Sequence, residues 1–524
     1  MKLHTPFTVD GHPILGTYVA QTVDDLKLVK DVGMNIVLGG HEHLDPKTEQ
    51  GRFCRENGIK VLHHLTQHVY NKPRLLDRVD SDQTTIPVNP DFPGKFAESG
   101  TIQLDDELVK YGATDGKSLL RCERGFRGTR RAEHRPGMIA FFPDDCANEI
   151  EEVRNSPNLW GYYVLDDSPG DAVSALRAMY RLVKRLDPDH PVTAGYGSAG
   201  SLCNFGPDVC DIMLFYWYPV DSFGTYRRDM TSHEVQWMLS AARKQVPGVP
   251  FAGVYQTFDA SFEAGKPSGK GLPTSAQVRE QIEDFVREGC CGLISFLCNH
   301  SGLAGWATND AMKAIIRETH REIRETGGVS VRPEPTELAR ARVQPQGFWH
   351  HPRDIPGIVP AWYVAAPFVA GEEKRLDAVF PPERGVDLNA AYEGKSGPVR
   401  WIRRLSFGGC VGLGELFGPH SYTAGCTAYA TCEVTSPREQ EVQMRIGSDD
   451  DMAVWLNGKQ AVWRVYAGGL RRDAEVHPAM LPEGRSRILV KVYNRAGMWG
   501  FFVRFTDRDG KPLDGLTFDP ADQG

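Results

Sequence analysis

The first 325 residues alternate between short apolar runs and longer stretches in which apolar residues recur every three to four positions. The short runs are rich in β-branched and aromatic residues, as buried strands are, and the longer stretches are typical of amphipathic helices. Thr22 followed by Asp25 has the pattern of a capping box and predicts the start of one helix. The predicted strands are Ile14–Ala20, Asn35–Gly39, Lys60–Leu65, Leu159–Leu165, Pro191–Ala194, Asp211–Tyr218, Pro250–Gln256 and Gly292–Leu297.

A strand followed by a helix, repeated eight times, predicts parallel strands joined by crossovers. We therefore predict an α/β fold, a (β/α)8 TIM barrel over residues 1–326, in preference to an open sheet. The alternation breaks at about 70–137, where turn residues are frequent and Asp115–Gly116 indicates a tight turn. This segment predicts a β-rich insertion after the third strand.

A second pattern begins beyond residue 360. Residues 327–360 contain six prolines and little periodicity, which indicates a Pro-rich linker. In 361–524 the apolar residues alternate with period two, as at Val442, Met444 and Ile446, and Asn457–Gly458 is a hairpin signal. Because helical periodicity is absent there, we predict an all-β jelly-roll or sandwich domain.

Composition narrows the class of protein. The formal net charge of −8 is against a nucleic-acid partner, because such binding depends on clustered Lys and Arg. All apolar runs are shorter than the roughly 20 residues of a membrane span. The start of the chain lacks a signal-peptide pattern, so we expect a cytoplasmic chain or a mature secreted or periplasmic one. The eleven cysteines follow no zinc-ligand spacing, and no oligomeric state is indicated.

The active site of a parallel barrel lies at the C-terminal ends of its strands, so the residues that follow each strand are the candidates. The predicted catalytic carboxylates are Glu42, Asp166, Asp167 and Asp259. Aromatic, imidazole and amide side chains lie near these carboxylates in the sequence. In carbohydrate-binding pockets aromatic faces stack on sugar rings and polar side chains bind the sugar hydroxyl groups. The predicted contacts to a carbohydrate ligand are His41, His43, His64, Trp160, Tyr216, Trp217, Tyr218, Gln256, Asn299 and Trp306.

The segment NLWGYYVLDDSPG, at 158–170, resembles the fourth-strand segment of glycoside-hydrolase-like barrels, in which GYY leads into Asp-Glu-Pro. In those barrels the acidic residue gives a proton to the leaving oxygen. Aligned on GYY, Asp167 takes the place of that glutamate and Asp166 that of the preceding aspartate. Aligned on the proline, Ser168 takes the glutamate position and the acid is absent. The motif DPDHPV, at 187–192, continues the resemblance, which covers about 10–325.

This resemblance implies a glycoside hydrolase with Asp167 as general acid and Asp166 as its electrostatic partner. A glycosidase also needs a second carboxylate, but the position at the end of the seventh strand holds Gln256, whose amide cannot act as base or nucleophile. Alternatively, the barrel binds carbohydrate without hydrolysing it, and the acids at 166–167 cap the next helix. If the barrel does hydrolyse sugars, a neighbouring loop supplies the second carboxylate, from Asp259, Glu263 or Glu42.

A metal-dependent hydrolase is the third interpretation, because His41 and His43 form a His-x-His pair after a strand. In amidohydrolase-like barrels that pair follows the first strand and further ligands come late in the chain. Here the pair follows the second strand, and Asn299 holds the eighth-strand position. We therefore predict no metal in the barrel, and the lack of a phosphate-binding glycine motif predicts no organic cofactor.

The C-terminal segment IGSDDDMAVWLNGK, at 446–459, resembles jelly-roll modules that are appended to bacterial glycoside hydrolases. The stretches at 483–494 and 499–505 continue this resemblance. Such modules bind sugar or brace the barrel. Within the segment, Asp449, Asp450 and Asp451 allow a calcium site with oxygen ligands or a solvated turn, and we favour the turn.

Overall fold

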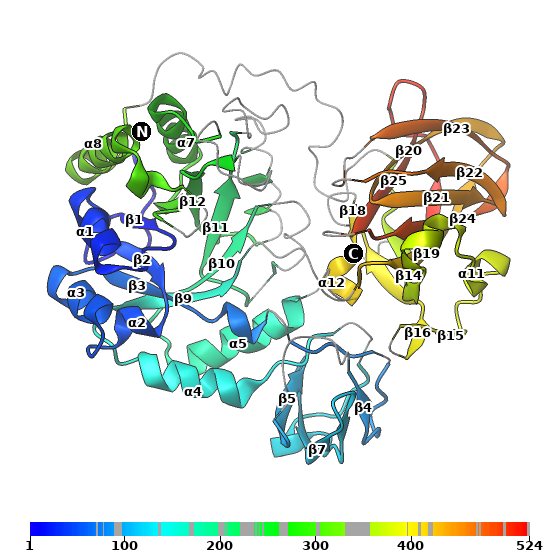
Figure 1. Ribbon diagram of the computed structural model, residues 1–524, viewed down its shortest axis with the longest axis horizontal. Helices are drawn as coiled ribbons and strands as arrows, with labels where there is room; N and C mark the ends of the chain where they lie inside the picture. Colours follow the sequence, from blue (N-terminus) through cyan, green and yellow to red (C-terminus); the bar gives the residue numbers. More distant parts are fainter. Residues whose placement is uncertain are drawn as a thin grey trace.

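The structure of the protein is a computed structural model, and Figure 1 shows a barrel, a small β-rich part and a β-sandwich. The described residues are 1–69, 72–76, 78–88, 97–134, 138–166, 172–197, 205–206, 208–220, 235, 238–239, 242–243, 246–260, 271–299, 304–330, 357–395, 397–406, 410–417, 423–467, 470, 473–495 and 499–520.

Eight parallel strands close into a barrel, as predicted. Each strand pairs with the next one along the chain, and the last pairs with the first, with Ile14 opposite Gly292. All eight C-terminal ends therefore lie at one rim. The strands are β1 (Ile14–Thr17), β2 (Ile36–Gly39), β3 (Lys60–His64), β9 (Leu159–Leu165), β10 (Val192–Tyr196), β11 (Ile212–Trp217), β12 (Phe251–Gln256) and β13 (Gly292–Phe296).

Helices connect the strands, and the sequence signals mark their ends. The Thr22 hydroxyl accepts a hydrogen bond from the amide of Asp25, whose carboxylate accepts one from the Thr22 amide, so the predicted capping box forms. Ser232, the predicted cap of the helix after β11, lies outside the described residues. The helices are α1 (Val23–Asp31), α2 (His41–Leu44), α3 (Glu49–Asn57), the 3-10 turn η1 (Thr66–His68), α4 (Pro143–Val153), α5 (Val173–Leu186), α7 (Ser275–Arg287), the 3-10 turn η5 (Trp306–Thr308) and α8 (Asp310–Thr326).

A β-rich segment lies between β3 and α4, so it emerges at the rim that carries the C-terminal strand ends. Its apolar side chains form a core of their own, which includes Ile86, Ile102 and Leu119. Inside it, Arg124 and Glu107 form a buried ion pair. Its elements are β4 (Ile86–Pro87), β5 (Gly100–Leu104), β6 (Glu107–Tyr111), β7 (Ala113–Thr114), β8 (Ser118–Leu120) and η2 (Phe126–Gly128).

Two antiparallel sheets form the C-terminal sandwich. One consists of β17 (Ile402–Leu405), β14 (Ala361–Val369), β19 (Cys426–Ser436), β24 (Gly484–Tyr493), β21 (Asp451–Leu456) and β22 (Lys459–Arg464), with β26 (Thr517–Asp519) beside β19. The other consists of β18 (Cys410–Gly412), β25 (Gly500–Thr506), β20 (Gln440–Asp449) and β23 (Glu475–Leu481). Side chains of both sheets meet in one core, where Trp362 and Phe501 lie edge to face.

Smaller elements complete the sandwich. Asn457 and Gly458, with φ of 51° and 76°, make the predicted hairpin turn between β21 and β22. The additional elements are α10 (Gly371–Lys374), η7 (Arg375–Asp377), α11 (Pro381–Arg384), β15 (Ala391–Glu393), β16 (Pro398–Arg400) and α12 (Gly414–Phe417). The predicted linker falls mostly on 331–356, outside the described residues. None of the helices in the described part of the chain is both long and apolar enough to span a membrane.

Candidate active site at the barrel rim

Three tyrosine hydroxyl groups meet inside the barrel, near the C-terminal ends of its strands. Tyr18 directly follows β1, Tyr163 lies on β9 and Tyr216 lies on β11. The Tyr18 oxygen is 2.7 Å from that of Tyr216 and 3.1 Å from that of Tyr163, and the Tyr163 and Tyr216 hydroxyls are hydrogen-bonded to each other. Burial raises the pKa of Tyr163 and Tyr216 well above the ordinary value, so both hydroxyls stay neutral.

The tyrosine cluster leads to a carboxylate at the rim. The Tyr163 hydroxyl donates a hydrogen bond of 2.8 Å to Oδ1 of Asp166, an exposed residue that directly follows β9. Asp166 therefore lies where a barrel active site is built. Asp167 and Ser168, the two alternatives for the general acid, lie outside the described residues, as does Glu263.

His64 lies beside this carboxylate. Its ring packs edge-on against Tyr163, with ring centroids 5.2 Å apart. Burial lowers the pKa of His64 to about 4, against the opposing influence of the Asp166 and Glu42 charges. His64 is therefore neutral at neutral pH.

Glu42 is the second carboxylate of the rim and lies on α2, directly after β2. Its Oε1 is 3.0 Å from Nδ1 of the buried His43. Hydrogen bonding to His43 lowers the pKa of Glu42 to about 2, although partial burial opposes the shift. Glu42 is thus an ionised, half-exposed carboxylate at neutral pH. His43 supports Glu42 through Nδ1, and its Nε2 is hydrogen-bonded to the Ala20 carbonyl at 2.8 Å, so its predicted sugar contact stays a prediction.

Aromatic rings continue the inner wall beyond Tyr216. The ring of Tyr218 stacks on that of Tyr216 at 6.1 Å and an interplanar angle of 16°. It also contacts Phe258 and Phe296, at 5.2 and 5.5 Å. Because Tyr218 and Phe296 are only half-buried, they offer flat apolar surface of the kind on which sugar rings stack.

Trp217 points away from this wall. Successive side chains of a strand face opposite sides, so an inward Tyr216 places Trp217 on the outside of the barrel. There it is buried against Phe285 of α7, with ring centroids 6.0 Å apart. The predicted sugar contact by Trp217 is therefore wrong.

The two other tryptophans of the predicted set also have structural roles. Trp306 is fully buried, and its indole donates a hydrogen bond to the Thr17 hydroxyl at 3.2 Å. Trp160 is the second residue of β9, at the end of the barrel opposite the rim. Its indole donates a hydrogen bond to the Thr8 carbonyl at 2.9 Å. Trp160 thus lies far from the rim, whereas Trp306 is buried beside the rim end of β1, and its sugar contact stays a prediction.

The predicted polar residues after β12 and β13 hold loops in place. Gln256 is fully buried; its side chain accepts from the Val220 amide at 2.9 Å and donates to the Val220 carbonyl at 3.0 Å. Asp259 is also fully buried and accepts from the Gly271 amide at 2.9 Å. Both side chains are thus engaged in loop contacts, and the sugar contact of Gln256 and the catalytic role of Asp259 stay predictions. Asn299 is exposed and lies beside α1.

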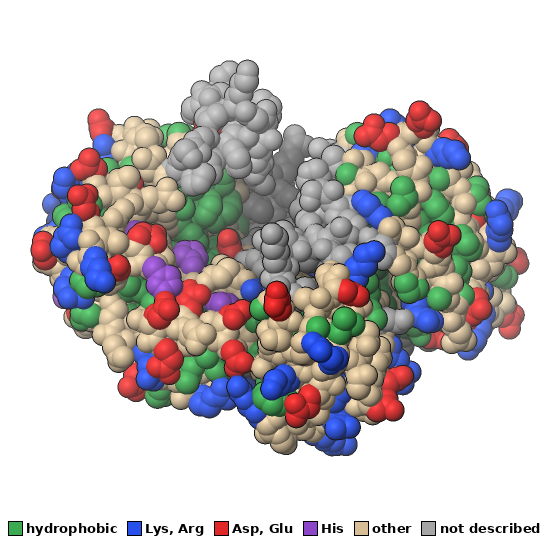
Figure 2. All heavy atoms as spheres, turned by 60° about the horizontal axis from the view of Figure 1, so that its bottom comes forward, with side chains coloured by type: hydrophobic (Ala, Val, Ile, Leu, Met, Phe, Trp, Pro, Cys, Tyr) green, Lys and Arg blue, Asp and Glu red, His purple; other side chains and the backbone are tan. Residues whose placement is uncertain are grey.

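A second polar cluster, which sequence reasoning missed, surrounds Glu149 of α4. Its Oε1 lies 2.9 Å from His63 Nε2 and 3.7 Å from His41 Nε2, and its Oε2 lies 2.8 Å from His68 Nε2. Gln67 donates to both oxygens, at 2.7 and 2.8 Å. Burial acts to raise the pKa of Glu149, but hydrogen bonds from His63 and His68 hold it well below the ordinary value. Figure 2 shows histidine and acidic side chains gathered on one face of the barrel.

One sequence signal points to Glu149. Cys146, Ile150 and Val153 form the buried stripe of α4, and Glu149 is on the same face, three residues after Cys146. An acidic residue within an apolar stripe needs polar partners. Those partners lie more than 80 residues earlier, across the insertion, so sequence spacing does not reveal them.

The acidic run of the sandwich is buried, which corrects the favoured interpretation of a solvated turn. Asp449, Asp450 and Asp451 are 6%, 4% and 0% exposed. Asp451 Oδ1 pairs with Arg495 at 2.6 Å. Burial and the neighbouring Asp450 charge raise the pKa of Asp449 to about 7.

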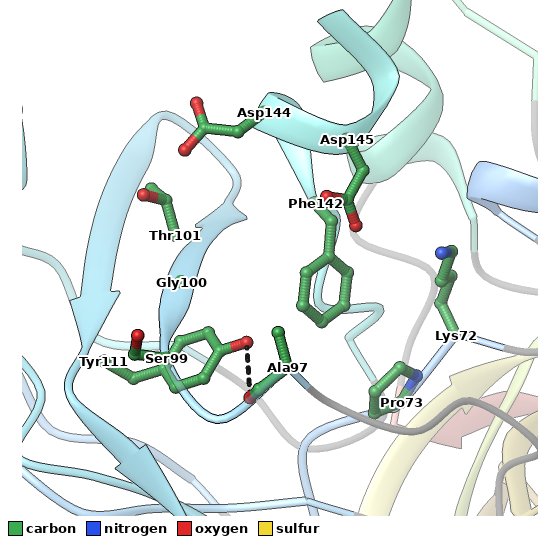
Figure 3. A pocket seen from close by; sticks show the side chains of 10 residues that line it. All are labelled: Lys72, Pro73, Ala97, Ser99, Gly100, Thr101, Tyr111, Phe142, Asp144 and Asp145. Atoms are coloured by element: carbon green, nitrogen blue, oxygen red, sulfur yellow. Dashed lines mark hydrogen bonds between the residues drawn. The ribbon is translucent and has the colours of Figure 1, made fainter. Parts of the chain in front are cut away.

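A cavity of about 260 Å³ lies between the insertion and the start of α4. Figure 3 shows that Lys72, Phe142 and Asp145 line it, with Tyr111 opposite and hydrogen-bonded to the Ala97 carbonyl. It has mixed polar and apolar walls, and the predicted site residues are not among those that line it.

The fold and the rim together define a parallel α/β barrel with a carboxylate-bearing, ring-lined rim and a C-terminal β-sandwich. No protein-family model matches the chain, and no curated protein sequence matches it.

Several solved structures to which the chain is similar are glycosidases. One is a GH2 β-galacturonidase from Eisenbergiella tayi bound to galacturonate, with 14% identity and a TM-score of 0.33 over 57% of this chain and 47% of that one. Another is a β-galactosidase from the psychrophilic Marinomonas ef1, with 10% identity and a TM-score of 0.35 over 59% of each chain. The chain spans about half the length of the first of these proteins. Likenesses of this degree assign no activity to it.

Proposed function

We propose that the barrel rim hydrolyses O-glycosyl bonds of an oligo- or polysaccharide. The observation that supports this most is the Asp166 carboxylate, held by the Tyr163 hydroxyl directly after β9, with the half-exposed Glu42 carboxylate following β2 at the same end of the barrel. Glycoside hydrolysis requires two catalytic carboxyl groups, and the proposed pair is Glu42 and Asp167, the residue that follows Asp166 in the chain.

The two carboxyl groups need different protonation states. Glu42, whose pKa is about 2, is ionised at neutral pH and suits the base or nucleophile. Asp167, next to Asp166, is proposed as the general acid on the strength of the family resemblance. Asp166 would then stabilise positive charge that develops on the sugar. Tyr218 and Phe296 would stack on the sugar ring.

Sugar release from a broad panel of oligosaccharides and polysaccharides tests this proposal. We expect release by the wild type and losses of at least about 100-fold in Asp167→Asn and Glu42→Gln, since acid–base catalysis typically contributes 10²–10⁴-fold. Asp82→Asn, an exposed aspartate of the insertion, is the matched control and should leave the rate unchanged. Full activity in Asp167→Asn would show that the general acid is elsewhere.

A carbohydrate-binding barrel without hydrolysis is the second candidate function. It is favoured by Gln256, a buried amide at the end of β12 where a second carboxylate is expected, and by the burial of the Asp259 carboxylate. This candidate function predicts that no substrate releases sugar. It also predicts saturable glycan binding by the wild type, which the Asp167→Asn variant retains. Binding that weakens in Tyr218→Ala would place the glycan on the ring-lined wall.

For the sandwich, we propose that the acidic run at 449–451 binds calcium. Asp451 is fully buried, and among the described residues its Oδ2 has no hydrogen-bond partner. Carboxylate oxygens are the ligands that calcium prefers. Calcium should raise the melting temperature of the wild type relative to chelated protein, and Asp451→Asn should abolish that increase.

A further inference from the structure

We propose that His41, His63 and Glu149 bind one divalent transition-metal ion of the Zn²⁺ class at the ends of β2 and β3. The proposal does not depend on the proposed sugar site, whose residues Glu42 and His64 are chain neighbours of His41 and His63. Its three residues come from α2, β3 and α4, which the barrel fold brings together.

The distances between the potential ligand atoms suit a shared ion. In a tetrahedral zinc site each ligand atom is about 2.0–2.1 Å from the metal, so the ligand atoms lie about 3.3 Å from one another. Glu149 Oε1 is 2.9 Å from His63 Nε2 and 3.7 Å from His41 Nε2. The longer distance exceeds that of a hydrogen bond, and one ligand atom from each residue lies within 4.8 Å of the others.

The chemistry of the three groups selects the kind of ion. Two imidazoles and one carboxylate suit zinc and neighbouring first-row ions, whereas magnesium and calcium prefer oxygen ligands alone. Zinc sites with three protein ligands accept a water molecule as the fourth, which is the arrangement of catalytic zinc.

Two further side chains orient the carboxylate. His68 Nε2 lies 2.8 Å from Glu149 Oε2, and Gln67 Nε2 also donates to that oxygen at 2.8 Å. Gln67 Nε2 also donates to Oε1 at 2.7 Å, the oxygen nearest the imidazoles of His63 and His41, so an ion bound there would replace this hydrogen bond. Metal sites commonly fix their ligands through such outer hydrogen bonds, and losing one costs about 10–100-fold in affinity.

The three proposed ligands differ in their exposure to solvent. The side chain of His63 is 1% exposed and that of Glu149 is 15%, whereas that of His41 is 51% exposed. An ion can therefore reach the cluster past the exposed His41. Because His41 is exposed, it can be replaced without creating a cavity in the core.

Metal titration of tag-free, chelator-treated protein tests the proposal. We expect one Co²⁺ per chain with visible absorption bands, and displacement by Zn²⁺. His41→Ala should weaken binding more than Gln67→Ala, which should weaken it about 10–100-fold. His12→Ala, an exposed histidine distant in sequence from the cluster, should bind as the wild type does. Circular dichroism should confirm that each variant is folded.

Two results would overturn the proposal: folded wild type that binds no Co²⁺, or His41→Ala that binds it as tightly as the wild type. The cluster would then only anchor α4 to β3 by hydrogen bonds. Glu149→Gln, which keeps the size of the side chain, provides a second variant and should lose Co²⁺ binding. Since the measured signal is metal absorption, absence of sugar release would leave this result unaffected.

Discussion

At the scale of single residues, the carboxylate of Glu107 is the centre of a buried charged cluster in the insertion. Arg124 donates to both of its oxygens, at 2.8 and 2.7 Å, and His134 lies 2.8 Å from Oε2. The side chains of all three residues are at most 1% exposed. Burial acts to raise the pKa of Glu107, but these hydrogen bonds lower it to about 2.

Glu107→Gln should destabilise the insertion by about 3–5 kcal/mol, because it leaves the buried charge of Arg124 without its partner. Chemical denaturation followed by circular dichroism measures this loss. Glu98→Gln, an exposed glutamate of the same insertion, should change stability by less than about 0.5 kcal/mol. Equal effects of the two substitutions would rule out a stabilising role for the ion pair.

The same residue predicts a pH dependence. The folded pKa of Glu107, about 2, is lower than its ordinary value of 4.5, so its stabilising contribution is complete above pH 4.5 and lost as the pH falls toward 2. The difference in unfolding free energy between wild type and Glu107→Gln should therefore shrink over that interval. A difference that stays constant from pH 6 to 2 would contradict the assignment.

Sequence reasoning at this scale was incomplete for a physical reason. The sequence showed aromatic residues at 216–218. Which of these side chains face the interior of the barrel depends on how the strand pairs with its neighbours, and the sequence pattern does not show that pairing. The structure places Tyr216 inward and Trp217 outward. Likewise, the burial of Gln256 and Asp259 depends on contacts to Val220 and Gly271, which only the folded loops create.

At the scale of elements, the apolar pattern predicted the barrel strands well. The predicted strand Leu159–Leu165 has the same bounds in the structure, and the other seven overlap their predictions. Strands of a parallel barrel are covered on both faces, so they appear in the sequence as continuous apolar runs. The Glu149 cluster was missed because it joins elements separated by the insertion.

The capping box of α1 gives a prediction at this scale. Thr22→Ala removes the hydroxyl that accepts from the Asp25 amide and should lower the free energy of unfolding by about 1 kcal/mol. Thermal and denaturant unfolding measure the change. Thr5→Ala, at an exposed position outside helices and strands, is the control and should have little effect. Equal stability of Thr22→Ala and wild type would mean that the cap does not contribute.

At the scale of the whole molecule, the barrel and the sandwich have separate hydrophobic cores with no residue in common. Ile316→Ala in α8 and Ile488→Ala in β24 each remove a fully buried side chain and should cost about 2–5 kcal/mol. Calorimetry should show that the two substitutions shift different transitions. A single unfolding transition whose midpoint temperature both variants lower equally would show that the two cores unfold as one unit.

The pairing of β1 with β13 also constrains how the barrel is completed during synthesis. The bonded side chains of Thr17 and Ser295 are separated by 278 residues, so the first strand waits for nearly the whole barrel sequence before its second neighbour exists. Every shorter nascent chain holds an open sheet with an unpaired edge, which is prone to pair with other chains. The risk of aggregation on the ribosome therefore ends only after β13 has left the exit tunnel.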